Sequence, residues 1–230
     1  MGSSVHDSTG ERRGTGVLCA LPEELGVLGE RVTARRGRQG LELLELQELG
    51  VLACVAGVGK VSAARAATLL LGEGVERLLV VGVCGGLRRH LDPGTLVHCS
   101  RAAQVDLAVR EGREATADGA LTEAWREVAP GPLGWFLTAD RPVLSSWRRL
   151  RLGRAYPGDC VADMETAAAA AVAEAAGVPW AALRAVTDRA GAGTPASFRE
   201  HFPVQAGRAA GSVPALLDRL VSLPQGGDSR

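Results

Sequence analysis

The sequence predicts a single α/β domain of three layers, in which helices flank a central sheet that is mixed and twisted. Its 230 residues, 46% of them apolar, are enough to bury a sizeable core. Strand-like and helical patterns alternate along the chain without a linker or an internal repeat. One strand, helix and strand follow each other within about 35 residues, as in a βαβ crossover. We expect the domain to span residues 15–223, between a disordered tail at 1–14 and a polar tail at 224–230.

The crossover lies in the first half of the chain. A first strand is expected to end in Leu21-Pro22-Glu23-Glu24, and two further strands are expected at Leu43–Gln47 and Val51–Ala56. Val61–Leu71 has the pattern of a helix with small residues on one face. Arg77–Val83 is nearly continuous in apolar residues, as a strand buried on both faces would be. The strands before and after the helix are therefore predicted to form a parallel pair.

The second half of the chain continues the alternation of strands and helices. Trp147–Arg154 is basic and is expected to be a solvated surface segment. Val161 is expected to lead into an Ala-rich helix at Met164–Ala176, because Gly177 and then Pro179 close that run. The remaining expected elements are a strand at Thr95–Ala103, a helix at Leu121–Val128, strands at Gly134–Thr138 and Pro179–Val186, and a final amphipathic helix at Val204–Leu223.

Charge and composition exclude several classes of function. Lys and Arg together number 26, as do Asp and Glu, so the chain has no basic footprint for nucleic acid or anionic lipid. The apolar stretches at Leu78–Val83 and Ala167–Ala176 are too short to span a membrane, and Met1–Gly14 lacks the apolar core of a signal peptide. The five cysteines fit buried, reduced thiols. These features predict a cytoplasmic protein whose partner is a small neutral or zwitterionic molecule.

Neither a metal nor another cofactor is expected. The four histidines are scattered and lack metal-ligand spacing. Gly57–Lys60 follows a predicted strand, but its surroundings do not match a phosphate loop, and Ser62 stands where a dinucleotide fingerprint needs its third glycine. The glycines of this turn either allow close packing of helix on strand, which the motif alone favours, or let a ligand approach the backbone.

Carboxylates stand directly after three predicted strands. Glu24, with Glu23 beside it, follows the first strand, Glu165 follows a short apolar run, and Asp188 follows the last predicted strand. Ligands of open α/β sheets bind beyond the carboxyl ends of the strands. Each carboxylate alone has a plainer explanation, as part of the first turn of a helix or as the cap of a turn. Three of them at comparable positions indicate a site for acid and base chemistry.

Five short motifs carry a resemblance to a known family. In chain order they are Cys19-Ala20-Leu21-Pro22-Glu23-Glu24, Gly57-Val58-Gly59-Lys60-Val61, Gly82-Val83-Cys84-Gly85-Gly86-Leu87, Asp163-Met164-Glu165-Thr166-Ala167 and Arg184-Ala185-Val186-Thr187-Asp188. Their order and spacing resemble the nucleoside phosphorylase and nucleosidase superfamily, and within it the 5′-methylthioadenosine/S-adenosylhomocysteine nucleosidases. The resemblance implies a nucleoside phosphorylase-like fold, no cofactor, a nucleoside as substrate and a homodimer or larger assembly.

The resemblance also implies roles for five residues. Asp188 is similar to the general acid that protonates N7 of the departing purine. Glu24 is similar to the residue that positions or deprotonates the attacking water, with Arg184 nearby. Glu165 is similar to the glutamate that holds the ribose hydroxyls, and Met164 to the methionine that packs on the sugar. These residue types suit cleavage of an N-glycosidic bond, because the reaction builds positive charge on the ribosyl ring and negative charge on the purine.

Further positions complete the expected substrate site, and some depart from the family pattern. Phe198 falls where the family places an aromatic ring against the 5′-substituent, and Gly85 lies in the third motif. Val83 stands where the nucleosidases usually have a small polar residue, and Leu21 replaces a methionine beside the sugar. Pro142–Val143 occupies the stretch where an aromatic ring normally stacks on the base. These departures concern the identity of the substrate and leave the carboxylates untouched.

The function that the resemblance implies is hydrolysis of a 5′-substituted purine nucleoside with release of the free base. The alternatives are a futalosine hydrolase, a hopanoid-linked nucleoside phosphorylase, and a nucleoside-binding protein without catalysis. Glu23 and Glu24 stand where the phosphorylases that resemble this chain place a phosphate-binding Gly and Arg. Because a carboxylate would repel phosphate, we expect hydrolysis rather than phosphorolysis.

Overall fold

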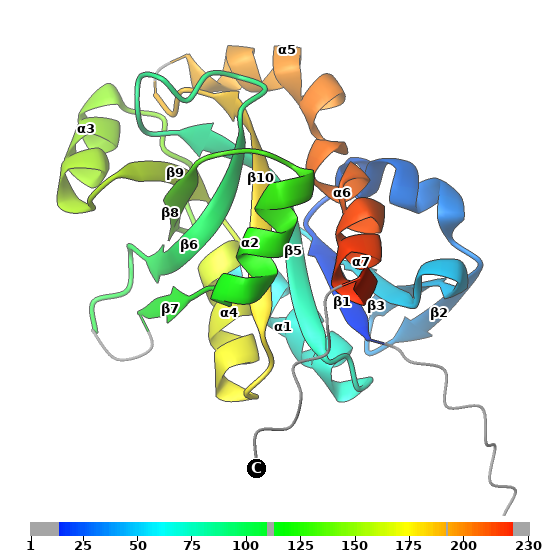
Figure 1. Ribbon diagram of the computed structural model, residues 1–230. Helices are drawn as coiled ribbons and strands as arrows, with labels where there is room; N and C mark the ends of the chain where they lie inside the picture. Colours follow the sequence, from blue (N-terminus) through cyan, green and yellow to red (C-terminus); the bar gives the residue numbers. More distant parts are fainter. Residues whose placement is uncertain (1–13, 110–112, 192, 223–230) are drawn as a thin grey trace, which may run out of the picture.

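The computed structural model describes residues 14–109, 113–191 and 193–222 (Figure 1). The two expected tails lie outside these residues, apart from Gly14. The described strands form one sheet of ten. They are β1 (Thr15–Cys19), β2 (Ala34–Arg38), β3 (Leu41–Leu46), β4 (Val51–Val55), β5 (Arg77–Gly86), β6 (Leu96–Gln104), β7 (Glu114–Thr116), β8 (Leu133–Thr138), β9 (Asp159–Asp163) and β10 (Trp180–Asp188).

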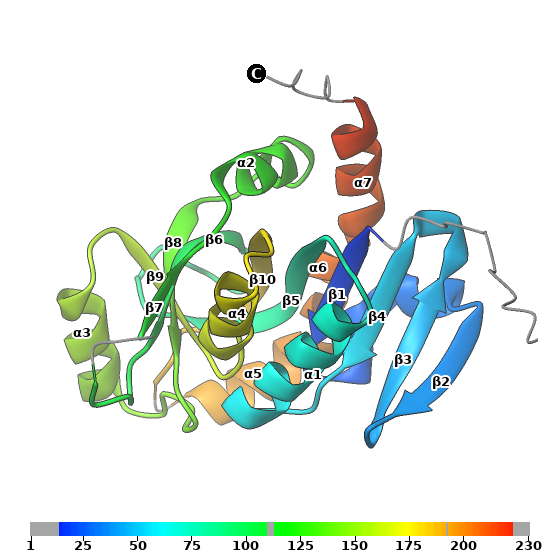
Figure 2. The ribbon, with the colours of Figure 1, turned by 90° about the horizontal axis from the view of Figure 1, so that it is seen from below.

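The sheet is mixed, and part of it closes on itself. β5 pairs with β10, and the path then runs through β6, β8 and β9 back to β5, so these five strands form a ring. On the other side of β5, the sheet continues through β1, β4, β3 and β2 and remains open at β2 (Figure 2). β5 is parallel to β1 and β10, whereas β6 is antiparallel to β10. The expectation of a central mixed sheet is thereby confirmed.

β5 and the first half of β10 are apolar because both strands have a hydrophobic core on each face. Every residue of β10 is buried. In β5, Leu78 and Val80 belong to one hydrophobic cluster, and Leu79 and Val81 belong to the other. Successive side chains of a strand point to opposite faces of the sheet, so a strand covered on both faces has a continuous apolar sequence.

Helices cover both faces of the sheet and give the domain its three layers. On one face, α1 (Lys60–Gly72) and α4 (Thr166–Ala175) pack against each other, and the buried alanines on both helices allow a close approach. The other face is covered by η1 (Pro22–Arg31), α2 (Gly119–Val128), α6 (Arg208–Gly211) and α7 (Val213–Ser222). The remaining helices are η2 (Gln47–Leu49), α3 (Ser146–Ala155) and α5 (Thr194–Gln205).

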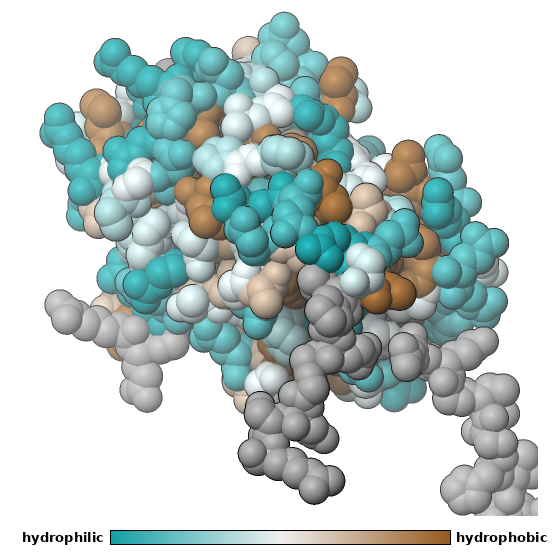
Figure 3. All heavy atoms as spheres, in the orientation of Figure 1, coloured by the Kyte–Doolittle hydropathy of each residue, from teal (hydrophilic) through white to brown (hydrophobic). Residues whose placement is uncertain are grey.

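The surface and the cysteines agree with a packed α/β domain. All five cysteines are buried and form no disulfide. On the face shown in Figure 3, exposed hydrophobic side chains are scattered among polar ones. Among the described residues, no helix has the length and apolar character needed to cross a membrane.

Three of the expected elements have different bounds or partners. Val161 lies in β9 rather than before a helix, and α4 begins only at Thr166, because Glu165 has a backbone φ of −130°, outside the helical range. The single helix expected at Val204–Leu223 is in fact the end of α5 followed by α6 and α7, and Pro214 stands in the first turn of α7, where a proline is tolerated. The two strands of the crossover are parallel, but β1 lies between them.

Candidate active site

A pocket of about 180 Å³ opens where β1, β5 and β10 end. These three strands are parallel, so their carboxyl ends meet at one edge of the sheet. β9 contributes its last residues to the same edge, because Ala162 pairs with Gly85. All nine residues expected in the site line the pocket: Glu24, Val83, Gly85, Val143, Met164, Glu165, Arg184, Asp188 and Phe198.

Glu24 is fixed in the pocket by backbone N–H groups. Its Oε2 accepts hydrogen bonds from Ala20 over 2.8 Å and from Leu21 over 3.0 Å, and its Oε1 accepts one from Val83 over 3.0 Å. The carboxylate thus satisfies free donors at the start of η1 and also lines the pocket. Both explanations expected from the sequence, a role in the first turn of a helix and a place in the site, therefore apply to Glu24. Burial raises the pKa of Glu24, although Arg184 and the backbone donors oppose this shift.

Gly82 makes room for Glu24. A Cβ atom at this position would lie 2.5 Å from Oε1 of Glu24, and the backbone φ of Gly82 is 151°. A side chain here would therefore displace the carboxylate or strain the strand.

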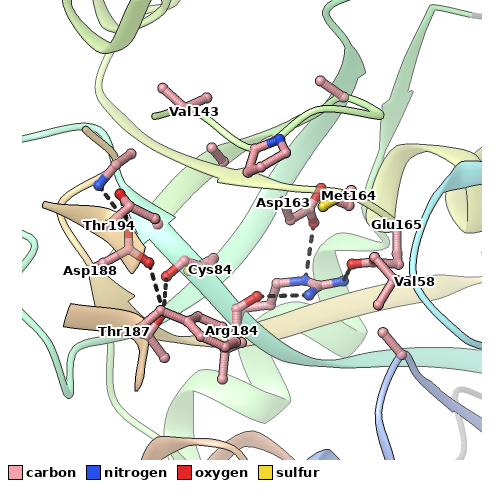
Figure 4. A pocket seen from close by; sticks show the side chains of 18 of the residues that line it. Val58, Cys84, Val143, Asp163, Met164, Glu165, Arg184, Thr187, Asp188 and Thr194 are labelled. Carbon is pink, nitrogen blue, oxygen red and sulfur yellow. Dashed lines mark hydrogen bonds and ion pairs between the residues drawn. The ribbon is translucent and has the colours of Figure 1, made fainter. Parts of the chain in front are cut away.

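Arg184 occupies the centre of the polar wall of the pocket. Its Nε lies 3.0 Å from Oδ2 of Asp163, and its Nη2 donates to Oε2 of Glu165 over 3.1 Å (Figure 4). Its Nη1 donates to the backbone oxygen of Val83 over 2.8 Å. Burial opposes the charge on Arg184, but Asp163, Glu165 and Glu24 together hold its pKa above the usual range. The guanidinium is therefore a permanent cation that orients the surrounding carboxylates.

Glu165 connects Arg184 to the turn before α1. While Oε2 accepts from Arg184, Oε1 accepts a hydrogen bond from the backbone N–H of Gly59 over 3.0 Å. Burial raises the pKa of Glu165, Arg184 opposes this shift, and Asp163 adds to it. Met164, directly before Glu165, also lines the pocket.

Asp188 stands at the end of β10 among hydroxyl and amide donors. Its Oδ1 accepts from the backbone N–H of Ala190 and from the Thr194 hydroxyl, each over 2.8 Å. Its Oδ2 accepts from the Thr187 hydroxyl over 2.9 Å. A Cβ atom at Gly85 would lie 3.0 Å from Oδ1 of Asp188, so this glycine leaves space for the carboxylate on the neighbouring strand.

Apolar residues form the rest of the wall. Val143 and Pro142 come from the loop after β8, and Phe198 comes from α5, where its ring stacks on Phe202 at a centroid distance of 4.8 Å. Val58 lies at the turn before α1 and is 51% exposed. The pocket therefore combines a polar wall of carboxylates with an apolar wall that suits a flat or aliphatic group.

Sequence reasoning missed four polar residues of the pocket: Asp163, Thr187, Thr194 and Arg141. Asp163 and Thr187 stand inside two of the five motifs. The sequence pattern places Asp163 just before a helix, whereas in the structure it is the last residue of β9. Thr194 contacts Asp188 across a turn and belongs to no motif. Arg141 is exposed at the rim.

The fold and the pocket define an α/β protein whose carboxylates and buried arginine can act on a small molecule by acid and base chemistry. A sequence model of the Phosphorylase superfamily matches residues 15–222, and the chain belongs to this superfamily. The resemblance indicated by the motifs is thereby confirmed.

Curated relatives include several 5′-methylthioadenosine/S-adenosylhomocysteine nucleosidases. The chain is 28% identical to one from Mycobacterium tuberculosis, over 90% of this chain and 96% of the relative. It is 29% identical to one from Geobacillus thermodenitrificans, over 69% of this chain and 75% of the relative. An aminodeoxyfutalosine nucleosidase from Campylobacter jejuni is 28% identical, over 58% of this chain and 65% of the relative.

Solved structures share the fold. A 5′-methylthioadenosine/S-adenosylhomocysteine nucleosidase from Neisseria meningitidis, in complex with methylthio-immucillin-A, superposes with a TM-score of 0.82. It is 24% identical, over 90% of this chain and 99% of that one. A futalosine hydrolase of Helicobacter pylori gives a TM-score of 0.83 at 22% identity, over 90% of this chain and 98% of that one.

Proposed function

We propose that the protein is a purine nucleosidase that hydrolyses the N-glycosidic bond of a 5′-substituted purine nucleoside, of the 5′-methylthioadenosine/S-adenosylhomocysteine type, and releases the free base. The observation that carries this proposal is the convergence of Glu24, Glu165 and Asp188 on one pocket that also holds Arg184. The names of the curated relatives support the same substrate class.

The three carboxylates have separate roles in the proposed reaction. Departure of the base leaves positive charge on the ribosyl ring and negative charge on the purine. Asp188, in its protonated form, donates a proton to N7 of the purine and so stabilises the leaving group. Glu165 holds the ribose hydroxyls, and its negative charge stabilises the cationic ring. Arg184 keeps Glu165 in place through its hydrogen bond to Oε2.

Glu24 activates the water in this proposal. Its Oε2 already accepts two hydrogen bonds, whereas Oε1 accepts one from a described residue and has a lone pair free for a water molecule. Burial raises the pKa of this carboxyl, which makes the carboxylate a stronger base than an exposed glutamate. Water held on Oε1 can then attack the ribosyl carbon as the base departs.

The apolar wall binds the rest of the nucleoside. We assign Val83, Gly85 and Val143, which all line the pocket, to the side of the purine; Gly85 pairs with Asp188 on the neighbouring strand. We assign Met164 to the sugar, since it adjoins Glu165. Phe198 contacts the 5′-substituent. An apolar wall suits an alkylthio group better than the free hydroxyl of an unmodified nucleoside.

The charges in the pocket favour water over phosphate as the nucleophile. A phosphate dianion needs cationic or N–H partners when it leaves water. Arg184 is already paired with Asp163 and Glu165, and the other arginine that lines the pocket, Arg141, is exposed at its rim. Glu24 would repel phosphate at the position where the nucleophile must stand.

A futalosine-type nucleoside is a second candidate substrate. The aminodeoxyfutalosine nucleosidase of Campylobacter jejuni is among the relatives, and the futalosine hydrolase of Helicobacter pylori has the same fold. Cleavage of such a nucleoside would use the same carboxylates.

The proposal includes a cytoplasmic homodimer. Val58 lines the pocket and Val61 lies in the first turn of α1; they are 51% and 83% exposed, and a second subunit seated on this segment would cover both. Light scattering of the purified protein measures the assembly directly. The five free thiols fit a reducing compartment.

A nucleoside panel tests the proposed activity. The protein is incubated with methylthioadenosine, adenosylhomocysteine, futalosine-type nucleosides, adenosine and inosine, with and without phosphate, and free base is measured by chromatography. We expect base release that does not depend on phosphate. A ribose 1-phosphate product that increases with added phosphate would overturn hydrolysis, and calorimetric binding without any base release would indicate a nucleoside-binding protein.

A further inference from the structure

The two carboxylate oxygens of Asp188 have different hydrogen-bond partners (Figure 4). Oδ1 accepts from the backbone N–H of Ala190 and from the Thr194 hydroxyl. The Thr194 hydroxyl itself accepts from the backbone N–H of Gly191 over 2.8 Å, so its own hydrogen is directed to Asp188. Among the described residues, Oδ2 has one partner, the Thr187 hydroxyl.

This difference decides which oxygen can carry a proton. A backbone N–H can only donate, and Thr194 is held as a donor, so Oδ1 receives two hydrogens and both of its lone pairs are engaged. A proton on Oδ1 would oppose both donors. A proton on Oδ2 meets no opposing hydrogen, provided that Thr187 turns its own hydrogen elsewhere.

Thr187 has another acceptor within reach. Its Oγ1 lies 3.3 Å from the backbone oxygen of Cys84 on the neighbouring strand β5. A hydroxyl has one hydrogen and two lone pairs, so Thr187 can donate either to Asp188 or to Cys84. While it donates to Cys84, its hydrogen no longer opposes a proton on Oδ2, and that proton can be directed to the purine.

We propose that Thr187 is a positioning residue that serves both protonation states of Asp188, donating to the Cys84 carbonyl while Oδ2 carries the proton and to Oδ2 once the proton has left. The inference rests on the proposed function, in which Asp188 protonates the purine. In that step the Oδ2–H bond breaks, an N–H bond forms at N7, and the electron pair of the glycosidic bond passes to the base. The hydrogen bond from Thr187 strengthens during the step, because its acceptor gains negative charge.

Two substitutions that differ in the hydroxyl test this inference. Thr187→Val removes the hydroxyl and keeps the branched shape of a fully buried side chain, whereas Thr187→Ser keeps the hydroxyl. The measurement is the pH profile of kcat/KM for base release. In Thr187→Val the ionised Asp188 loses a charge-assisted hydrogen bond, so we expect the alkaline limb to move to higher pH by roughly half to one unit and kcat to fall about tenfold. In Thr187→Ser we expect the alkaline limb of the pH profile to stay at its original pH.

Other titratable or charged groups around the pocket are the same in all variants. They are Glu24 from η1, Cys84 from β5, Arg141 from the loop after β8, Asp163 from β9, Glu165 before α4 and Arg184 from β10. A difference between the profiles of the variants therefore reports on the group at position 187.

Clear outcomes would overturn the inference. The inference is wrong if Thr187→Val melts at about the temperature of the unmodified protein and still keeps the original alkaline limb of the pH profile. It is also wrong if Thr187→Ser shifts that limb as far as Thr187→Val does. Thr187→Ala also lacks the hydroxyl and carries the same test if the valine variant does not fold. Failure of the proposed function is distinguishable, because the unmodified protein would then release no base from any nucleoside of the panel.

Discussion

The backbone N–H of Gly59 donates a hydrogen bond to Oε1 of Glu165 across 106 positions of the sequence. This contact joins the Gly-x-Gly turn before α1 to the Met-Glu motif before α4. The glycine-rich turn, for which the sequence alone favoured plain packing, thus supports a carboxylate of the pocket. A backbone donor is independent of side-chain rotamers, so it fixes Glu165 from one side while Arg184 fixes it from the other.

Replacing Asp188 by asparagine should remove the general acid and keep the fold. We expect Asp188→Asn to lower kcat by at least about a hundredfold, the lower end of what general acid catalysis contributes. Asn keeps an oxygen that can accept from Ala190 and Thr194, so the melting temperature should change little. Asp218→Asn, on the exposed face of α7, is the matched control and should keep full activity. A nearly normal rate in Asp188→Asn would remove Asp188 from the mechanism.

Glu165→Gln should discriminate between ribose and 2′-deoxyribose substrates. If Glu165 holds the ribose hydroxyls, its loss harms ribose substrates more, because the deoxyribose lacks one of the partners. The measurement is kcat/KM for a ribonucleoside and its 2′-deoxy analogue with both proteins. Equal losses on the two substrates would place Glu165 away from the hydroxyls.

Gly82→Ala should inactivate the protein through Glu24. The added Cβ would lie 2.5 Å from Oε1 of Glu24, at a backbone φ that an alanine rarely adopts. We expect a loss of kcat of at least about tenfold, together with a lower melting temperature. Gly37→Ala, on the exposed strand β2, has no atom within 4 Å of the new Cβ and should leave activity unchanged. An active Gly82→Ala would show that Glu24 can act from another position.

Stability should depend on pH through Glu24. Its pKa is raised in the folded state from the usual value of 4.5, so the folded protein binds more protons than the unfolded chain. The stabilising contribution of this group is therefore complete below about pH 4.5 and is lost as the pH rises through the raised pKa. We expect Glu24→Gln to gain in free energy of unfolding relative to the unmodified protein as the pH rises from about 4.5 to 8 in urea titrations. Glu23→Gln, at an exposed neighbour, should show no such trend.

Lys60 should control substrate affinity more than turnover. Its Nζ lies 2.7 Å from Oδ1 of Asp106 and 3.5 Å from Oδ2 of Asp140, and Asp140 begins the segment that leads to Pro142 and Val143 in the pocket wall. We expect Lys60→Met to raise KM by roughly threefold to tenfold with little change in kcat, since ion pairs of this kind contribute about 1 kcal/mol. Lys60→Arg should retain most of the affinity. A fall in kcat at constant KM would contradict this role.

Local apolar patterns predicted the strands that are buried on both faces. They missed a strand that is held by strand pairing and ion pairs. β10 and β5 were found because burial on both faces leaves a nearly continuous apolar run, interrupted in β10 by Arg184. β2 was missed because its sequence, Ala34–Arg38, contains almost no apolar residue. It pairs with β3 and is held by ion pairs, among them Arg36 with Glu45 and Arg38 with Glu73. The closure of the ring depends on pairing between distant strands, which no local pattern reveals.

The same limit applies to the candidate site, because local patterns reveal residues next to an apolar run and not residues paired with a distant partner. Glu24, Glu165 and Asp188 could be placed because each follows a short apolar run at a strand end or in a family motif. Asp163 could not, because its partner Arg184 lies 21 positions away and the segment before it resembled the start of a helix. The roles of these residues in catalysis stay predictions until the variants are measured.

The place of β10 in the ring has a consequence for the newly made protein. Among the described strands, β10 is the last to leave the ribosome, yet it lies between β5 and β6, which are made roughly a hundred residues earlier. Until residue 188 has emerged, β5 lacks one neighbour, and Arg184 and Asp188 are absent from the polar wall. A nascent chain therefore lacks the complete pocket, and the exposed edges of β5 and β6 are open to wrong pairing with other chains during that interval.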